Sequence, residues 1–138
     1  MIWVVVIGAI LFILFRFLND YNKDNYDLRG QALNEKFKVI VNMINTVAFN
    51  GQGIVTQRDK REFNLYREKE NQIINFIYST GNLTITWKYK YFQKEVIHER
   101  TFYDVRNLSL FEQQEIGEIM IEEMGQVVAK HKNNVLNL

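Results

Sequence analysis

The first eighteen residues, 1–18, form a nearly uninterrupted apolar run in which Arg16 is the only charged side chain. As an α-helix rising 1.5 Å per residue, this run reaches roughly 27 Å, against about 30 Å for the hydrocarbon core of a bilayer. Trp3 and Arg16 lie near its ends, where interfacial aromatic and snorkelling basic side chains are expected. The run therefore predicts an uncleaved transmembrane anchor of a single-pass membrane protein.

Three other interpretations of this run are less favourable. A cleaved signal peptide has a basic start and a small-residue cleavage site, and the sequence offers neither. A buried core helix has polar positions on one face, which the run lacks. A pilin-like extracytoplasmic subunit shares the outline of an N-terminal helix followed by an antiparallel sheet, but we find no basic leader and no early acidic residue. The transmembrane anchor stays the favoured interpretation.

The charges after the run indicate its orientation. Arg16, Lys23 and Arg29 follow the apolar segment, with three aspartates interleaved, whereas only the α-amino group precedes it. The positive-inside bias therefore places the C-terminal domain in the cytoplasm. Residues 19–30 are polar and are expected to form a juxtamembrane linker, or else to continue the anchor helix.

The rest of the chain has the composition of one small globular domain. The whole chain has 138 residues, so about 120 follow the anchor, enough for a single core. The chain has 17 basic and 16 acidic residues, and the anchor holds one of the basic residues. The rest of the chain therefore has no net charge, which argues against a nucleic-acid partner. Cysteine is absent, so disulfides and thiolate chemistry are excluded.

Two segments are predicted to be amphipathic helices. Residues 31–49 carry apolar side chains at helical spacing, and Asn50 and Gly51 follow as a stop signal. Ser109 and Glu112 have the spacing of a capping box at the start of a last helix that closes near Lys132. The apolar stripe of that last helix comprises Phe111, Ile116, Ile119, Met120, Met124 and Val127. Residues 133–138 are expected to fray.

Between these helices the sequence predicts an antiparallel meander. Residues 73–78, 83–92 and 95–105 are rich in β-branched and aromatic side chains and are separated by turn residues. Residues 51–72 are the least readable part, interpreted as a loop with a strand near 62–67. A turn centred on residues 93 and 94 would set Trp87 opposite Arg100 and Tyr89 opposite His98, although a slipped register is also possible.

Within this pattern no constellation indicates catalysis, a metal or a cofactor. His98 and His131 are the only histidines, and neither has a ligand-spaced partner. Gly117 and Gly125 lie inside the last helix and suggest close approach of another backbone. Glycine-rich phosphate-binding loops are absent. We therefore predict no catalytic residue, no metal ligand and no cofactor.

Interaction surfaces remain as the candidate sites. Aromatic and basic residues alternate over 87–92, so the rings and the lysines lie on opposite faces of a strand, and the rings are expected to form core. Three carboxylates share one face of the last helix and are expected to be solvated. The candidate surface residues are Trp87, Tyr89, Tyr91, Glu115, Glu118 and Glu122.

The sequence as a whole predicts an α+β protein. An N-terminal transmembrane helix (1–18) and a linker (19–30) precede an α+β domain (31–132) and a frayed tail (133–138). The domain is expected to hold a three- to four-stranded antiparallel meander covered by two helices. Its expected role is non-enzymatic interaction at a membrane, with the lipid bilayer and a protein partner or a second copy as partners. The partner is expected to dock on the exposed sheet face, an edge strand or the final helix. The alternative is a ligand-sensing domain with a pocket lined by Trp87, Tyr89 and Met120.

Overall fold

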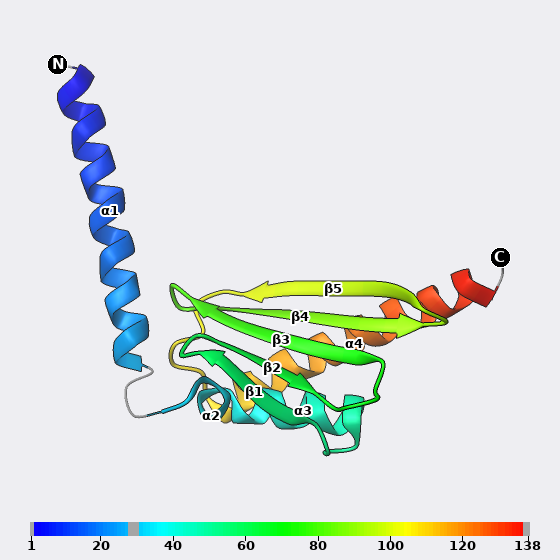
Figure 1. The fold of residues 1–138 in the computed structure, drawn as a ribbon. Helices are drawn as coiled ribbons and strands as arrows, with labels where there is room; N and C mark the ends of the chain where they lie inside the picture. Colours follow the sequence, from blue (N-terminus) through cyan, green and yellow to red (C-terminus); the bar gives the residue numbers. More distant parts are fainter. Residues whose placement is uncertain (1, 28–30, 137–138) are drawn as a thin grey trace.

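The computed structural model describes residues 2–27 and 31–136, with the side chains of 17 and 19–27 excepted. A long N-terminal helix, α1 (Ile2–Asp27), stands apart from a domain in which one sheet lies over three helices (Figure 1). Of the two alternatives for residues 19–27, the helical continuation is observed. Residues 28–30 of the expected linker lie outside the described residues.

The predicted helix over 31–49 is divided into two helices. α2 (Leu33–Lys36) and α3 (Lys38–Phe49) meet at Phe37, whose φ of −107° and ψ of 32° interrupt regular helical geometry. The expected stop is confirmed, because Asn50 and Gly51 adopt positive φ values of 53° and 79°. Such a left-handed pair is a common way for a helix to end.

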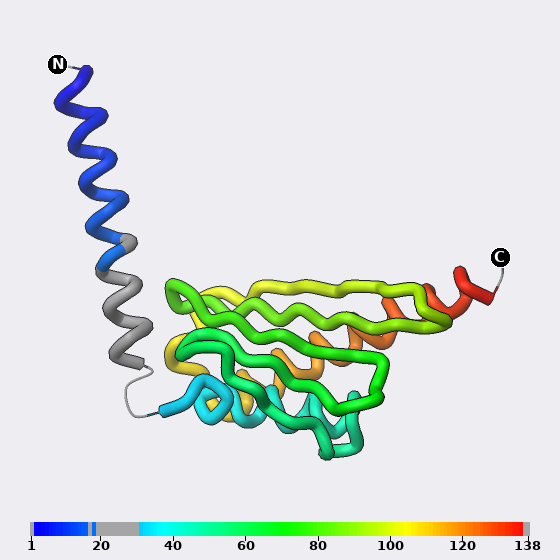
Figure 2. The backbone as a smooth tube through the Cα atoms, viewed as in Figure 1, coloured from blue at the N-terminus to red at the C-terminus, as the bar shows by residue number. Residues whose placement is uncertain are grey.

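The sheet has five antiparallel strands rather than three to four. They are β1 (Ile54–Asp59), β2 (Glu62–Tyr66), β3 (Gln72–Ser79), β4 (Asn82–Tyr91) and β5 (Lys94–Phe102). Each strand pairs with the next along the chain, so the sheet is the predicted meander (Figure 2). The strand that the sequence did not indicate is β1, an edge strand whose residues are mostly exposed and therefore lack an apolar alternation.

The β4–β5 hairpin differs from the expected register by two residues. Its turn is formed by Phe92 and Gln93, with φ values of 49° and 61°, one residue earlier than expected. Trp87 consequently lies opposite His98. A shift of two residues leaves every side chain on the face assigned to it, because side chains alternate with a period of two. The face predicted for each side chain is therefore confirmed, whereas the predicted cross-strand pairs of β4 and β5 are wrong.

The last helix, α4 (Leu110–Leu136), begins as predicted and ends later. The Ser109 hydroxyl accepts a hydrogen bond from the Glu112 amide at 3.1 Å, and the Glu112 carboxylate accepts one from the Ser109 amide at 3.2 Å. The capping box is thus confirmed. The helix continues through most of the tail in which fraying was expected, and residues 137–138 lie outside the described part of the chain.

The apolar stripe of α4 is rotated relative to the prediction. Phe111 is exposed, and Gln113 is buried in its place. Gln113 is held there because its side-chain amide donates a hydrogen bond to the Lys36 carbonyl at 3.0 Å. Ile116, Met120 and Met124 are buried as expected. The first turns of α4 therefore pack inward with Gln113, which is hydrogen-bonded to α2, on their buried face.

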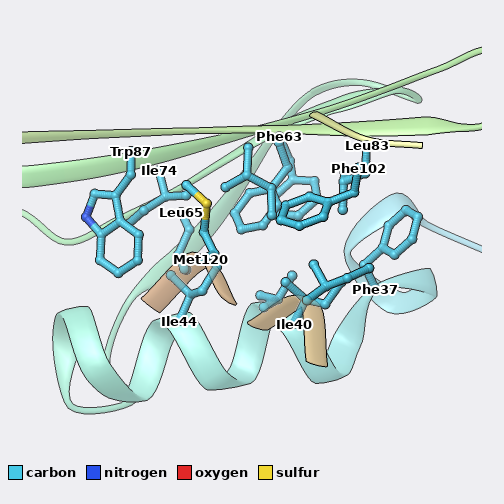
Figure 3. Packing of buried hydrophobic residues seen from close by; sticks show 14 of the residues in the cluster. Phe37, Ile40, Ile44, Phe63, Leu65, Ile74, Leu83, Trp87, Phe102 and Met120 are labelled. Carbon is cyan, nitrogen blue, oxygen red and sulfur yellow. The ribbon is translucent and has the colours of Figure 1, made fainter. Parts of the chain in front are cut away.

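The core lies between the sheet and the helices. Figure 3 shows Phe63, Leu65 and Ile74 facing helical residues across this layer. Phe63 and Phe76 stack with their ring centroids 4.5 Å apart. The buried apolar residues come from every strand except β1 and from α2, α3 and α4. A two-layer α+β sandwich of this kind positions one sheet face inward and leaves the other face uncovered by any described element (Figure 1).

The two α4 glycines are in different surroundings. A Cβ on Gly117 would lie 2.7 Å from the Met43 sulfur, so α3 and α4 approach closely at this position. Nothing lies within 4 Å of a Cβ on Gly125. The expected close approach therefore applies to Gly117 alone, and it involves a side chain of α3.

Helix α1 is unlike the rest of the molecule. Its large apolar side chains, from Ile2 to Leu18 among those described, are 43–81% exposed. Within the described residues, the helices do not reach the combination of length and apolar character that a bilayer crossing requires. The expected N-terminal transmembrane helix is therefore not found.

Candidate interaction surfaces

The aromatic residues of β4 do not form a surface with the α4 carboxylates. Trp87 is only 3% exposed and belongs to the core. Its indole N–H donates to the Gln72 side-chain oxygen at 2.8 Å, and the Gln72 amide donates to the Ala48 carbonyl at 2.9 Å. This chain of hydrogen bonds links β4, β3 and the end of α3. Trp87 is therefore a structural residue.

Tyr89 and Tyr91 lie beside the C-terminal part of α4. The Lys132 ammonium is 5.9 Å from the centre of the Tyr89 ring and 5.3 Å from that of Tyr91. The His131 ring nitrogen lies 2.8 Å from the Lys94 carbonyl, to which it donates a hydrogen bond. These contacts hold the end of α4 against the β4–β5 hairpin. Both tyrosine rings are therefore partly covered by α4.

The predicted carboxylates are exposed on α4, as expected for a solvated face. Glu118 accepts a long hydrogen bond of 3.5 Å from the Gln114 amide, and Glu122 is exposed. Glu115 borders a hollow of about 330 Å³ between the end of β5 and the start of α4. The six predicted residues are thus divided between the helix-covered side of the sheet and the outer side of α4.

A different carboxylate of α4 has specific partners. Glu123 contacts the His98 ring at 3.0 Å and also accepts a hydrogen bond from Arg100. Both partners belong to β5, so the Glu123 carboxylate fastens α4 to the last strand. Because the two histidines of the chain both bridge α4 and β5, their observed role is structural. Among the described residues, no group of histidines and carboxylates has the arrangement of a metal site.

One face of the sheet is not covered by any described element (Figure 1). We call it the open face; its residues alternate with the core residues along β1–β5. Two shallow hollows of about 420 Å³ each lie on it and share Ile73 and Lys88. One extends toward the β2–β3 connection, and the other extends over the middle of the sheet. Ile54 and Ile97 are exposed at its two edges.

The polar side chains of the open face are ordered by cross-strand hydrogen bonds. The Asn75 amide donates to the Asn64 side-chain oxygen at 2.7 Å, and the Thr86 hydroxyl donates to Glu99 at 2.7 Å. Thr84 and Thr101 share a hydrogen bond of 2.9 Å. These pairs fix side chains on neighbouring strands in one geometry. A partner would therefore meet a surface whose polar groups are already positioned.

Comparison with known proteins returned no match among family models, curated proteins or solved structures. The functional argument therefore rests on the surfaces themselves.

Sequence reasoning named the exposed sheet face as one docking surface, but the residues it singled out were the β4 aromatics and the α4 carboxylates, not residues of this face. The signal was present in the alternation of 87–92, which already assigned the lysines to the face opposite the rings. Lys88 does lie on the open face, at the junction of the two hollows. Extending the same alternation to β2 and β3 would have identified Asn64 and Asn75 as its other members.

Proposed function

We propose that this chain is a non-enzymatic, single-pass membrane-anchored interaction protein. Its α+β domain presents the open face to a protein partner or to a second copy at the membrane surface. The observation that carries the proposal is the contrast between α1, whose apolar side chains are exposed, and a domain whose core is complete without them. The exposed apolar side chains of α1 require a cover that the domain does not supply.

Lipid is the cover that we infer for α1, although its described side chains alone do not make up a full membrane span. Residues 2–18 rise roughly 26 Å as a helix, slightly less than the hydrocarbon core, and bilayers thin locally around short segments at modest cost. The apolar side chains surround the helix on every side, whereas a partner helix would require one apolar stripe. Arg16, near the end of this segment, is placed to reach the headgroups. The domain would then follow on the cytoplasmic side.

Vesicle flotation of the full chain tests the anchor. We expect the protein to float with phosphatidylcholine vesicles and to resist carbonate extraction, because α1 is inserted. Leu11→Asp places a charge in the middle of the apolar segment and should release the protein. Phe92→Asp, in an exposed hairpin turn, is the matched control and should not. If neither variant is released from the vesicles, or if carbonate extracts the unchanged chain, then α1 is not an inserted anchor.

The side of the membrane is tested with a single cysteine, because the chain contains none. Asn134→Cys lies on the exposed end of α4. In intact cells, a membrane-impermeant thiol reagent should leave it unmodified until the membrane is opened. Labelling in intact cells would place the domain outside the cytoplasm and favour the filament-subunit alternative.

Photo-crosslinking in membranes tests the open face. A crosslinking side chain at Ile97, on the open face, should give a discrete adduct with a partner or with a second copy. The same group at Glu118, on the outer side of α4, should not. Equal adducts from both positions, or none from either, would argue against the open face as the docking surface. The ligand-sensing alternative has less support, since Trp87 and Met120 are buried and neither lines the three hollows.

A further inference from the structure

Three large side chains are exposed in the connection from β5 to α4 and in the first turn of α4. Tyr103, Leu110 and Phe111 are 74%, 72% and 68% exposed, although each could be buried elsewhere in a small domain. We call them the tip patch. Tyr103 lines the hollow of about 330 Å³ together with Leu108 and Glu112, which flank the other two members in the chain. The patch is therefore one local feature of the β5–α4 connection.

The tip patch lies at the end of the domain where the chain arrives from α1. α2 is the first domain element after α1, and the Lys36 ammonium donates a hydrogen bond of 2.6 Å to the Arg106 carbonyl in the β5–α4 connection. The Gln113 side chain returns a bond to the Lys36 carbonyl. Figure 1 shows this connection at the same end of the sheet as α2. The entry point of the chain and the tip patch are thus fastened together.

The covalent geometry keeps this end of the domain near the end of the apolar part of α1. Residues 19–27 add nine residues of helix, roughly 14 Å, of which the headgroup layer takes about 5–8 Å. Asp27 and Gln31 are separated by four backbone steps, which span at most about 14 Å. The chain can therefore fold the tip patch back onto the bilayer surface.

We propose that the tip patch inserts into the interfacial layer of the same bilayer and so fixes the orientation of the domain. This inference rests on the proposed membrane anchor. Tyrosine and phenylalanine beside an aliphatic side chain suit the boundary between headgroups and acyl chains. The charges around the patch balance, comprising Lys36, Arg100 and Arg106 against Asp104, Glu112 and Glu115. Insertion is therefore driven by apolar contact and does not require anionic lipid.

Single-cysteine fluorescence with the full chain in phosphatidylcholine vesicles tests the proposal. An environment-sensitive fluorophore is attached to Phe111→Cys, and nitroxide-bearing lipids serve as quenchers. The matched negative control is Ile97→Cys on the open face, and the positive control is Phe12→Cys in α1; both positions are exposed in the structure. We expect a blue shift and quenching at positions 12 and 111, and neither at 97. Leu110→Cys is the second reporter of the patch.

The outcomes separate this inference from the anchor on which it rests. Quenching at position 12 with none at 111 or 110 overturns the tip patch and leaves the anchor intact. Absence of quenching at position 12, with loss of flotation, overturns both. Quenching at 111 that requires anionic lipid overturns the apolar mechanism. Quenching at 111 and 110 in pure phosphatidylcholine, together with an unquenched 97, supports insertion of the tip patch rather than docking of a protein there.

Discussion

Helices α1 and α4 have almost the same length, 26 and 27 residues, and opposite relations to the rest of the molecule. α4 carries an apolar stripe that packs on the sheet and on α3, with carboxylates on its outer side. α1 is apolar on all sides over its first half, and its described side chains are exposed. The comparison teaches that apolar content alone does not make a core helix; an amphipathic distribution does.

The largest expected difference between the two helices is the effect of truncating one apolar side chain. Met120→Ala on α4 removes a fully buried side chain and should lower the free energy of unfolding by about 2–5 kcal/mol. Leu11→Ala on α1 should change it by less than about 0.5 kcal/mol, because no domain residue loses a contact. Urea unfolding in mild detergent measures both, with Trp3→Phe in every chain so that the fluorescence comes from the buried Trp87 alone.

A matched substitution on the outer side of α4 controls for helix propensity. Glu118→Ala should leave the free energy of unfolding within about 0.5 kcal/mol of the parent value. A loss of more than about 2 kcal/mol from Leu11→Ala would break the comparison, because it would mean that α1 packs on the domain in solution.

The contrast between the helices also shows what the sequence can predict. The helical period identified Ile116, Met120 and Met124 as core, and all three are buried. It misplaced Phe111 and Ile119, which are exposed, and it missed the buried Gln113, whose hydrogen bond to α2 joins residues far apart in the chain. Periodicity counts apolar side chains, and a buried amide is invisible to it.

The sheet was predictable to a similar degree. Alternation in 83–92 assigned each side chain to the correct face, whereas β1 was missed because its apolar residues end at Val55. The β4–β5 register was misjudged because Phe92 and Gln93 adopt positive φ values that glycine or asparagine usually take. The open face follows from alternation, but the position of the tip patch beside α2 depends on hydrogen bonds between residues far apart in the chain, which local sequence does not encode.

A second substitution tests the amide that orients α4. Gln113→Ala leaves the Lys36 carbonyl without its amide donor and should lower the free energy of unfolding by about 1–3 kcal/mol. Gln114→Ala, on the exposed neighbouring position, is the control and should have little effect. If chemical denaturation shows equal stabilities for the two variants, the Gln113 hydrogen bond does not determine the rotation of α4.

A third substitution concerns the start of α4, where Ser109 and Glu112 form the capping box. Ser109→Ala removes the hydroxyl that accepts a hydrogen bond from the Glu112 amide. The substitution should lower the free energy of unfolding by about 1 kcal/mol, which is measured as a lower thermal unfolding midpoint. Ser109→Asp preserves an acceptor and should restore most of the loss. An alanine variant as stable as the parent would show that the first turn of α4 is held by Gln113 and not by its cap.

The smallest expected effects come from the glycines inside the two helices. Gly125→Ala meets nothing within 4 Å and relieves the entropic cost of a mid-helix glycine, so it should raise the free energy of unfolding by about 0.5–1 kcal/mol. Gly117→Ala should gain less or lose stability, because its Cβ would contact the Met43 sulfur, and Met43→Ala in the same chain should recover the gain.

Gly8→Ala in α1 also meets nothing within 4 Å, yet it should leave the unfolding of the domain unchanged. The same chemical change then reports whether a helix belongs to the cooperative unit. Stabilisation of the domain by Gly8→Ala, measured by the same Trp87 fluorescence, would mean that α1 and α4 unfold together.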